Sequence, residues 1–206
     1  WGAIITGKGR AFSVGHDLLE MSSGGHVGGV RSTDELYFLE QNISKPIIAA
    51  INGLCLAQGA GVALGADILV VSETAQFGWP QVKRGISSIS GPVILSHRIP
   101  LCKAMELLMT GEFMSAKEAL DLGLVNYVVP EEKVMQKTEE LVHKILQNAP
   151  LAVSAMKNAA VKALHMSLTD RLSVATMIFN DVRNTEDAQE GLKAFEEKRD
   201  PVFKGR

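Results

Sequence analysis

The stretch "INGLCLAQGAGVALGADI", residues 51–68, decides the fold of this chain. It continues an apolar run into glycines and alanines, and its first charged residue is Asp67. Small residues directly after an apolar run indicate a strand that ends in a tight turn and opens a helix. Because the first N–H groups of a helix have no partners within it, such a turn is a common site for a negatively charged group.

The segments around this stretch repeat one order of elements. "KPIIAAIN" (45–52) and "DILVVS" (67–72) are predicted to be buried strands, and "QGAGVALGA" (58–66) is predicted to be the helix between them. An earlier copy of this order starts with an apolar run at 2–7 and continues through a turn into a helix start within 8–21. Buried strands that alternate with helices are typical of parallel sheets with crossover connections.

The second half of the chain is predicted to be mostly helical. Ser115 and Glu118 match a capping box at a helix start, and Gly123 lies where a glycine commonly ends a helix. Helical periodicity predicts helices at 90–100, 102–111, 115–123, 131–147, 150–165, 168–183 and 187–199. We therefore predict an α/β core over residues 1–129 and a helical carboxy-terminal region over 130–206.

Two segments of the first half do not fit the repeated order. Residues 22–33 are rich in glycine and serine and are predicted to form a mobile loop. Residues 33–43 have leucine and isoleucine at helical spacing and acidic residues at the start, which predicts a helix. The apolar piece at 75–79 is predicted to be a short strand, and the segment at 124–130, in the second half of the chain, is predicted to be a strand or an extended link.

Composition excludes several classes of protein. The chain has 206 residues, 46% of them hydrophobic, which is enough for one sizeable core. A formal net charge of −2 provides no basic field for nucleic acid. No apolar stretch is long enough for a membrane span, and no signal peptide is visible. Cys55 and Cys102 both lie in apolar contexts and are predicted to be reduced core residues, which favours a cytoplasmic protein. The abrupt start at Trp1 leads us to expect further natural sequence before it.

Four motifs, in order along the chain, resemble those of the crotonase (enoyl-CoA hydratase/isomerase) superfamily. "GRAFSVGHDL" (9–18) resembles its first oxyanion-loop motif, and residues 45–85 resemble its second. Residues 107–130 and 190–203 resemble its downstream and terminal signatures. The resemblance implies a spiral of ββα repeats with a helical carboxy-terminal trimerisation region, an acyl-CoA ligand and a homotrimer or hexamer. It implies no metal, and no cofactor beyond the coenzyme A of the substrate.

The resemblance implies that the backbone N–H groups of Val14 and Gln58 form an oxyanion hole. The oxygen of a thioester gains negative charge when water adds to a conjugated double bond or when a proton leaves the α-carbon. Two N–H donors aimed at that oxygen stabilise this charge whatever side chains they carry. The alternative is that both positions are only tight turns between strands and helices.

The same motifs imply a set of residues that contact the substrate: Phe12, Ser13, Gly15, His16, Asp17, Leu18, Gly59, Phe195 and Lys198. Asp17 is expected to cap the helix that follows it. His16 is either an acid or base near neutral pH or a surface histidine. Phe195 and Lys198 match positions that contact the CoA adenine and phosphate, but the surrounding charges are equally typical of a solvated helix face.

Two glutamates that transfer protons in the hydratases of this superfamily are replaced here. The matching positions are Gly61 and Gln81, the latter in "FGWPQ" (77–81). Neither residue can carry a proton at neutral pH, and acid–base groups of this kind contribute roughly 10²–10⁴ each to a rate. Gln81 is expected either to bind a water or a substrate oxygen or simply to complete a loop.

Three serines, Ser87, Ser88 and Ser90, follow in "GISSISGP" (85–92) and are expected to make the acyl pocket more polar. They do not match a serine nucleophile motif.

These residues leave three hypotheses for the function. The first is an enoyl-CoA hydratase/isomerase-type enzyme with unusual proton-transfer groups. The second is a catalytically weak member that binds acyl-CoA for assembly or regulation. The third is a different reaction on the same oxyanion hole, such as hydrolysis or decarboxylation. The preserved oxyanion motifs favour any function in which a thioester binds, and we choose the first.

Overall fold

The protein is described by a computed structural model that covers residues 1–17, 19, 37 and 39–206. Leu18, the predicted loop at 22–33 and part of the predicted helix at 33–43 lie outside the described residues, whereas residues 39–42 are helical. The strands are β1 (Ala3–Thr6), β2 (Ala11–Ser13), β3 (Ile47–Ile51), β4 (Leu54–Leu56), β5 (Ile68–Ser72), β6 (Gln76–Gly78), β7 (Phe113–Ser115) and β8 (Tyr127–Val129). The α-helices are α3 (Gln58–Gly65), α4 (Ser96–Arg98), α5 (Leu101–Thr110), α6 (Ala116–Asp121), α7 (Val134–Leu146), α8 (Pro150–Lys162), α9 (Leu168–Arg183) and α10 (Glu186–Glu197).

The chain divides into two compact units, which we call the core unit (residues 4–41 and 47–139) and the helical unit (residues 1–3, 42–46 and 140–206). The strands form two four-stranded sheets, with the orders β1-β3-β5-β8 and β2-β4-β6-β7. In the first sheet β5 is parallel to both β3 and β8, and in the second β4 is parallel to both β2 and β6. The β6–β7 pair is antiparallel. The prediction of an α/β fold with parallel sheets is confirmed.

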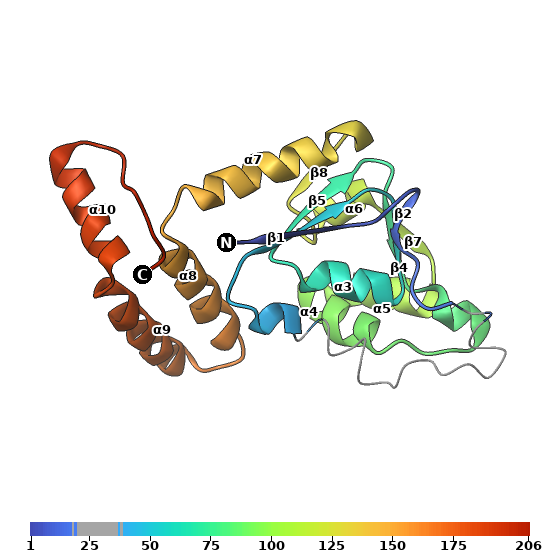
Figure 1. The fold of residues 1–206 in the computed structure, drawn as a ribbon. Coiled ribbons are helices and arrows are strands. Elements are labelled where there is room, and N and C mark those ends of the chain that lie inside the picture. Colours follow the sequence, from blue (N-terminus) through green and yellow to red (C-terminus); the bar gives the residue numbers. More distant parts are fainter. Residues whose placement is uncertain (18, 20–36, 38) are drawn as a thin grey trace. The chain divides into compact units, whose positions relative to one another are not determined.

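The first sheet holds the most buried part of the core. Every residue of β3 is buried, as are the last four of β5, which explains why both segments are continuous apolar runs without alternation. Helix α3 packs against β2 and β4, and its alanines allow close contact (Figure 1). Cys55 on β4 is buried, and burial raises the pKa of its thiol. Cys102 is exposed, so the prediction that it lies in the core was wrong.

The second sheet was not predicted from the sequence. The turn at Asn52 and Gly53 divides the opening stretch, and residues 54–56 form the separate strand β4 before α3 begins. Residues 11–13 form β2, where a turn and a helix start were expected. Both strands have only three residues, which is too short for a periodic pattern to show. Their pairing depends on a close approach, since a β-carbon on Gly53 would lie 2.2 Å from the carbonyl oxygen of Arg10.

The segment from 90 to 100 also differs from its prediction as one helix. Residues Gly91–Leu95 form a π-helical turn, and the short α4 follows directly. A 3₁₀-helix, Pro80–Arg84, precedes them after β6. Such π-helical turns occur often near functional sites because they alter the direction of neighbouring side chains.

The helical unit contains α8, α9 and α10 together with the end of α7, which confirms the predicted helical carboxy-terminal region. Helix α9 contacts both α8 and α10. The buried carboxylate of Asp187 accepts hydrogen bonds from the backbone N–H groups of Lys204 (2.6 Å) and Gly205 (2.8 Å), and this fixes the last residues beside α10. None of the described helices is both long and apolar enough to cross a membrane.

The capping box of α6 is confirmed and gives a test of the fold. Ser115 Oγ accepts from the Glu118 N–H, while Glu118 Oε2 accepts from the Ser115 N–H at 2.9 Å. We expect Ser115→Ala to lower the free energy of unfolding by about 1 kcal/mol in urea denaturation at neutral pH. The matched control is Ser173→Ala on α9, whose hydroxyl only bonds a carbonyl within its own helix and should change little.

The same capping box predicts a pH dependence. The hydrogen bonds that the Ser115 backbone N–H and, after it, the Ser115 hydroxyl (2.8 Å) donate to Glu118 lower the pKa of this carboxylate in the folded protein, and Ser115→Ala removes only the second of them. A lowered carboxylate pKa stabilises the fold above the unfolded pKa of about 4.3, and this contribution is lost as the pH falls through the folded pKa. The stability difference between the wild type and Ser115→Ala should therefore shrink in part in acid, and an unchanged difference at pH 3 would contradict the bond from the Ser115 hydroxyl to Glu118.

Candidate active site

The first element of the candidate site is the loop after β2. Gly15 in this loop has a φ of +89°, a left-handed conformation that glycine adopts without strain. Its N–H donates to Ser13 Oγ at 3.4 Å. The side chain of Val14, between these two residues, is 55% exposed. The loop is therefore a tight turn at the surface of the core unit, with the backbone of Val14 at its centre.

The second element is the start of α3. Ala57 precedes the helix with φ 55° and ψ −123°, a conformation that is strained for a residue with a side chain. Its N–H donates to the carbonyl of Gly78 on β6 at 2.8 Å, so the strained residue is held in place by the second sheet. Gln58 then forms the first turn of an eight-residue helix whose dipole favours negative charge.

The two elements lie against each other. The parallel pairing of β2 with β4 places Ser13 opposite Cys55, so both strands lead into their turns at the same edge of the sheet. A β-carbon on Gly15 would lie 2.9 Å from that of Ala57 and 3.4 Å from the backbone nitrogen of Gln58. The structure therefore brings together the two segments that carry the predicted donors, Val14 and Gln58.

At Gly61, one of the two positions where the resemblance implies a replaced glutamate, the space for a side chain is occupied by Ser90. A β-carbon on Gly61 would lie 2.8 Å from the β-carbon of Ser90 and 3.0 Å from its hydroxyl oxygen. Ser90 is buried, and its hydroxyl donates to the side-chain oxygen of Gln58 at 3.5 Å. The sequence motifs identified Gly61 as a departure, but only the three-dimensional contact shows that Ser90 occupies the space beside it.

Gln81, the other position where the resemblance implies a replaced glutamate, borders a cavity of about 370 Å³ in the core unit. Gln81 lines this cavity from the 3₁₀-helix, and Trp79 lines it from the residue before that helix. Ser87 and Ser88, two of the three serines expected to make the acyl pocket more polar, also line this cavity, and that expectation stays a prediction. Trp79 was not predicted as a site residue, although its indole N–H within the "FGWPQ" motif was a signal that could have identified it.

The remaining predicted contacts are less closely grouped. Phe12 is half-buried and packs against the hydrophobic core, and Gly59 lies so close to Ser13 that a β-carbon would meet the serine side chain at 2.4 Å. His16 and Asp17 are exposed, and the Asp17 carboxylate accepts from the Leu19 N–H at 2.8 Å, as expected of a helix cap. Leu18 lies outside the described residues.

Phe195 and Lys198 lie in the other unit, at the end of α10. Phe195 is 85% exposed, and Lys198 ends the helix with a left-handed φ of 54°. Nearby, Arg199 hydrogen-bonds Glu190, which lowers the pKa of this carboxylate to about 2. Both the predicted contact with coenzyme A and the alternative of a solvated helix face stay open at these two positions.

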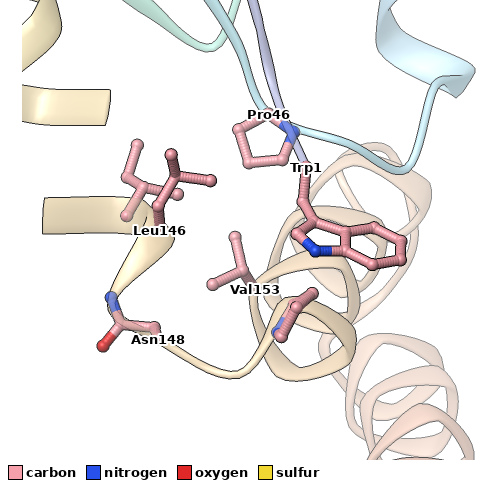
Figure 2. Close-up of a pocket in the computed structure, with 7 residues that line it drawn as sticks. Trp1, Pro46, Leu146, Asn148 and Val153 are labelled. Carbon is pink, nitrogen blue, oxygen red and sulfur yellow. The ribbon is translucent and has the colours of Figure 1, made fainter. Parts of the chain in front are cut away.

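The helical unit contains a second, much smaller pocket. The pocket drawn in Figure 2, between Trp1, Pro46, Leu146, Asn148 and Val153 of the helical unit, has a volume of only about 10 Å³. Such a volume holds about one water molecule. The described residues contain no group of three or more histidine, cysteine, aspartate or glutamate side chains that could hold a metal ion.

The close contact between Gly61 and Ser90 makes a prediction about stability. Gly61→Ala should lower the free energy of unfolding by about 1–3 kcal/mol, because the added methyl group collides with a β-carbon that cannot move alone. In a Ser90→Gly background the same substitution should be neutral or stabilising, since alanine is favoured over glycine within a helix. Urea denaturation of the four proteins in this cycle measures the coupling, and additive effects would contradict the contact.

Comparison with known proteins identifies the chain's relatives. The family described as enoyl-CoA hydratase/isomerase matches residues 1–206. A carnitinyl-CoA dehydratase of Salmonella heidelberg is 39% identical over 216 residues, which span 99% of this chain and 81% of the relative. A crystal structure of an enoyl-CoA hydratase from Bacillus anthracis superposes with a TM-score of 0.92 at 33% identity, covering 100% of this chain and 82% of the other. An enoyl-CoA hydratase from Mycobacterium marinum gives 0.90 at 37% identity, covering 100% and 81%.

Proposed function

The chain belongs to the enoyl-CoA hydratase/isomerase family and is an enzyme of the hydratase/isomerase type, and from this premise we propose that it stabilises the enolate of an acyl-CoA thioester. The N–H groups of Val14 and Gln58 act as the two donors to the thioester oxygen. The observation that carries this proposal is the contact between the two loops. A β-carbon on Gly15 would lie 3.4 Å from the backbone nitrogen of Gln58.

The strain at Ala57 supports this function. A residue held in an unfavourable conformation at a helix start is typical of sites where a backbone N–H must point at a ligand. The parallel strands β2 and β4 hold both loops from the same edge, so the donors need not be assembled when substrate binds. Donors that are already oriented stabilise a developing negative charge without reorganisation during the reaction.

Proton transfer in this enzyme uses groups other than the two glutamates of standard hydratases. Ser90 occupies the space beside Gly61, and Gln81 presents an amide to the cavity. An amide can orient a water molecule or a substrate oxygen but cannot exchange a proton at neutral pH. This favours slow hydration of simple enoyl-CoA, with a catalytically weak acyl-CoA-binding role or another reaction on the same oxyanion hole as alternatives.

Assembly into a homotrimer or hexamer stays a prediction of the resemblance. Large apolar side chains are exposed along α9 and α10, among them Leu168, Leu172, Met177, Phe179 and Phe195. Apolar surface of this kind is typical of contacts between subunits, which supports the prediction.

A direct test of the oxyanion hole compares two substitutions at Gln58. Gln58→Ala keeps the backbone N–H, whereas Gln58→Pro removes it at the first helical position, where proline is best tolerated. With a ¹³C-labelled thioester carbonyl, bound acyl-CoA should show a C=O stretching band lowered in frequency by hydrogen bonding in the wild type and in Gln58→Ala. The shift should decrease in Gln58→Pro, and any turnover should fall by about 10²–10³.

Titration calorimetry with acetyl-CoA and butanoyl-CoA is the companion measurement. We expect heat of binding at or below millimolar ligand for all three proteins, with thermal denaturation confirming that each is folded. A wild type that binds neither thioester would disprove the proposed function, and an identical band position in the proline variant would disprove the role of Gln58.

The replaced glutamates make a second prediction. A variant with Gly61→Glu, Ser90→Gly and Gln81→Glu restores both carboxylates and removes the side chain that blocks one of them. We expect crotonyl-CoA hydration, followed by loss of the enoyl absorbance, to rise by at least about 10²-fold over the wild type. The matched control replaces Gly61 with glutamine in the same Ser90→Gly background, which fills the same space without a transferable proton and should give no gain.

A further inference from the structure

Two turns lie side by side where the chain passes from the first sheet to the second. One connects β1 to β2, and the other, at Asn52 and Gly53, connects β3 to β4. The two turns are in close contact, because a β-carbon on Gly53 would lie 2.2 Å from the carbonyl oxygen of Arg10. The side-chain Nδ2 of Asn52 donates to the carbonyl of Gly9 at 2.7 Å and to that of Ala11 at 3.4 Å. A single side chain therefore joins both turns.

The other end of this amide indicates what Asn52 does. Its Oδ1 is buried and has no hydrogen-bond partner among the described residues. A buried acceptor without a partner lowers the stability of a fold. An apolar side chain of similar size would avoid this cost, but it could not donate to the two carbonyl oxygens. The donor side of the amide is therefore the reason for an asparagine at this position.

The segment held in this way contains an irregularity in the pairing of β2 with β4. Ala11 pairs with Leu54 and Ser13 pairs with Cys55, so two steps along β2 match one step along β4. The extra residue of β2 is Phe12, which packs against the hydrophobic core. Extra residues of this kind bend a strand and are common beside active sites, where they redirect the chain that follows.

This irregularity decides where the loop after β2 lies. Moving the pairing by one residue displaces a strand by about 3.3 Å and turns its side chains to the opposite face. Val14, in the loop, is 55% exposed, so burial contributes little to holding it in place. The position of its N–H therefore depends on the strand before it. Asn52 holds that strand at Ala11, directly before the extra residue.

We infer that Asn52 is a positioning residue for the first donor of the oxyanion hole. Its bonds to the carbonyls ahead of the extra residue fix the N–H of Val14 beside that of Gln58. Asn52 acts through the strand, since three residues, about 10 Å of extended chain, separate the carbonyl of Ala11 from Val14. This inference rests on the proposed function, because it assumes that the two N–H groups bind a thioester oxygen.

The test measures the oxyanion hole and the stability of the fold separately. Asn52→Leu removes the amide at similar size, and Asn52→Asp keeps the shape but has only acceptors at neutral pH. With bound butanoyl-CoA that carries a ¹³C-labelled carbonyl, the lowering of the C=O stretching frequency should shrink to about half in both variants, because one of two donors is displaced. Any turnover of crotonyl-CoA should fall by about tenfold or more. Titration calorimetry gives the ligand concentration that saturates each protein.

The matched control is Thr6→Val on β1. The Thr6 hydroxyl donates to the carbonyl of Ala50 at 2.7 Å, which equals the shorter bond of Asn52 and joins segments a similar distance apart in sequence. This bond lies within the first sheet and does not hold β2. Its loss should lower the Tm by about 2–4 °C, as should the Asn52 substitutions, but it should leave the C=O band at the wild-type frequency.

The outcomes separate this inference from the proposed function. An unchanged band in either folded Asn52 variant would overturn the inference and leave acyl-CoA binding intact. An equal change in Thr6→Val would also overturn it, since any weakened sheet would then have the same effect. So would failure of both Asn52 variants to fold, because the residue would then hold the whole fold and not the loop alone. A wild type that binds no thioester, or that leaves the band of a bound thioester unshifted, would overturn the proposed function itself.

Discussion

The close approach of α3 to the end of β2 is the constraint on which the candidate site depends. No side chain fits at Gly59, because a β-carbon there would lie 2.4 Å from that of Ser13. Parallel pairing of β2 with β4 fixes the direction of approach, and the strained Ala57 turns the chain into the helix at that point. The two loops are therefore held against each other, as the proposed oxyanion hole requires.

A second close contact in the same helix limits which side chains fit there. About one turn after the start of α3, Gly61 lies against the buried side chain of Ser90. A larger side chain at position 61 and a serine at position 90 therefore compete for the same space. The proposed oxyanion hole depends on backbone N–H groups and proton transfer depends on side chains, so the two features can vary separately on this fold.

The neighbouring cavity has a partly polar wall. The turn that carries Ser90 also places Gly91 against the indole of Trp79, and the 3₁₀-helix before it carries Gln81. The amide oxygen of Gln81 and the indole N–H of Trp79 are buried there without a hydrogen-bond partner among the described residues.

Sequence reasoning succeeded where the residues of a single segment form a recognisable pattern. The long apolar runs became β3 and β5, the box at Ser115 and Glu118 caps α6, and helical periodicity located the helices of the carboxy-terminal region. It failed for β2 and β4, which have three residues each and are strands only because they pair with neighbouring strands, including each other. It also placed Cys102 in the core, because an apolar neighbourhood in sequence does not fix which face of a helix is buried.

The sequence by itself determined the family and showed that neither position 61 nor position 81 is glutamate, since these depend on residue identity and order alone. Only the tertiary structure decided which residues surround those two positions. Ser90 is twenty-nine positions away from Gly61, and Trp79 meets Gly91 across a turn, so no local pattern records either contact. Van der Waals exclusion and the pairing of buried polar atoms act between neighbours in space, and those neighbours exist only once the sheets have brought the segments together.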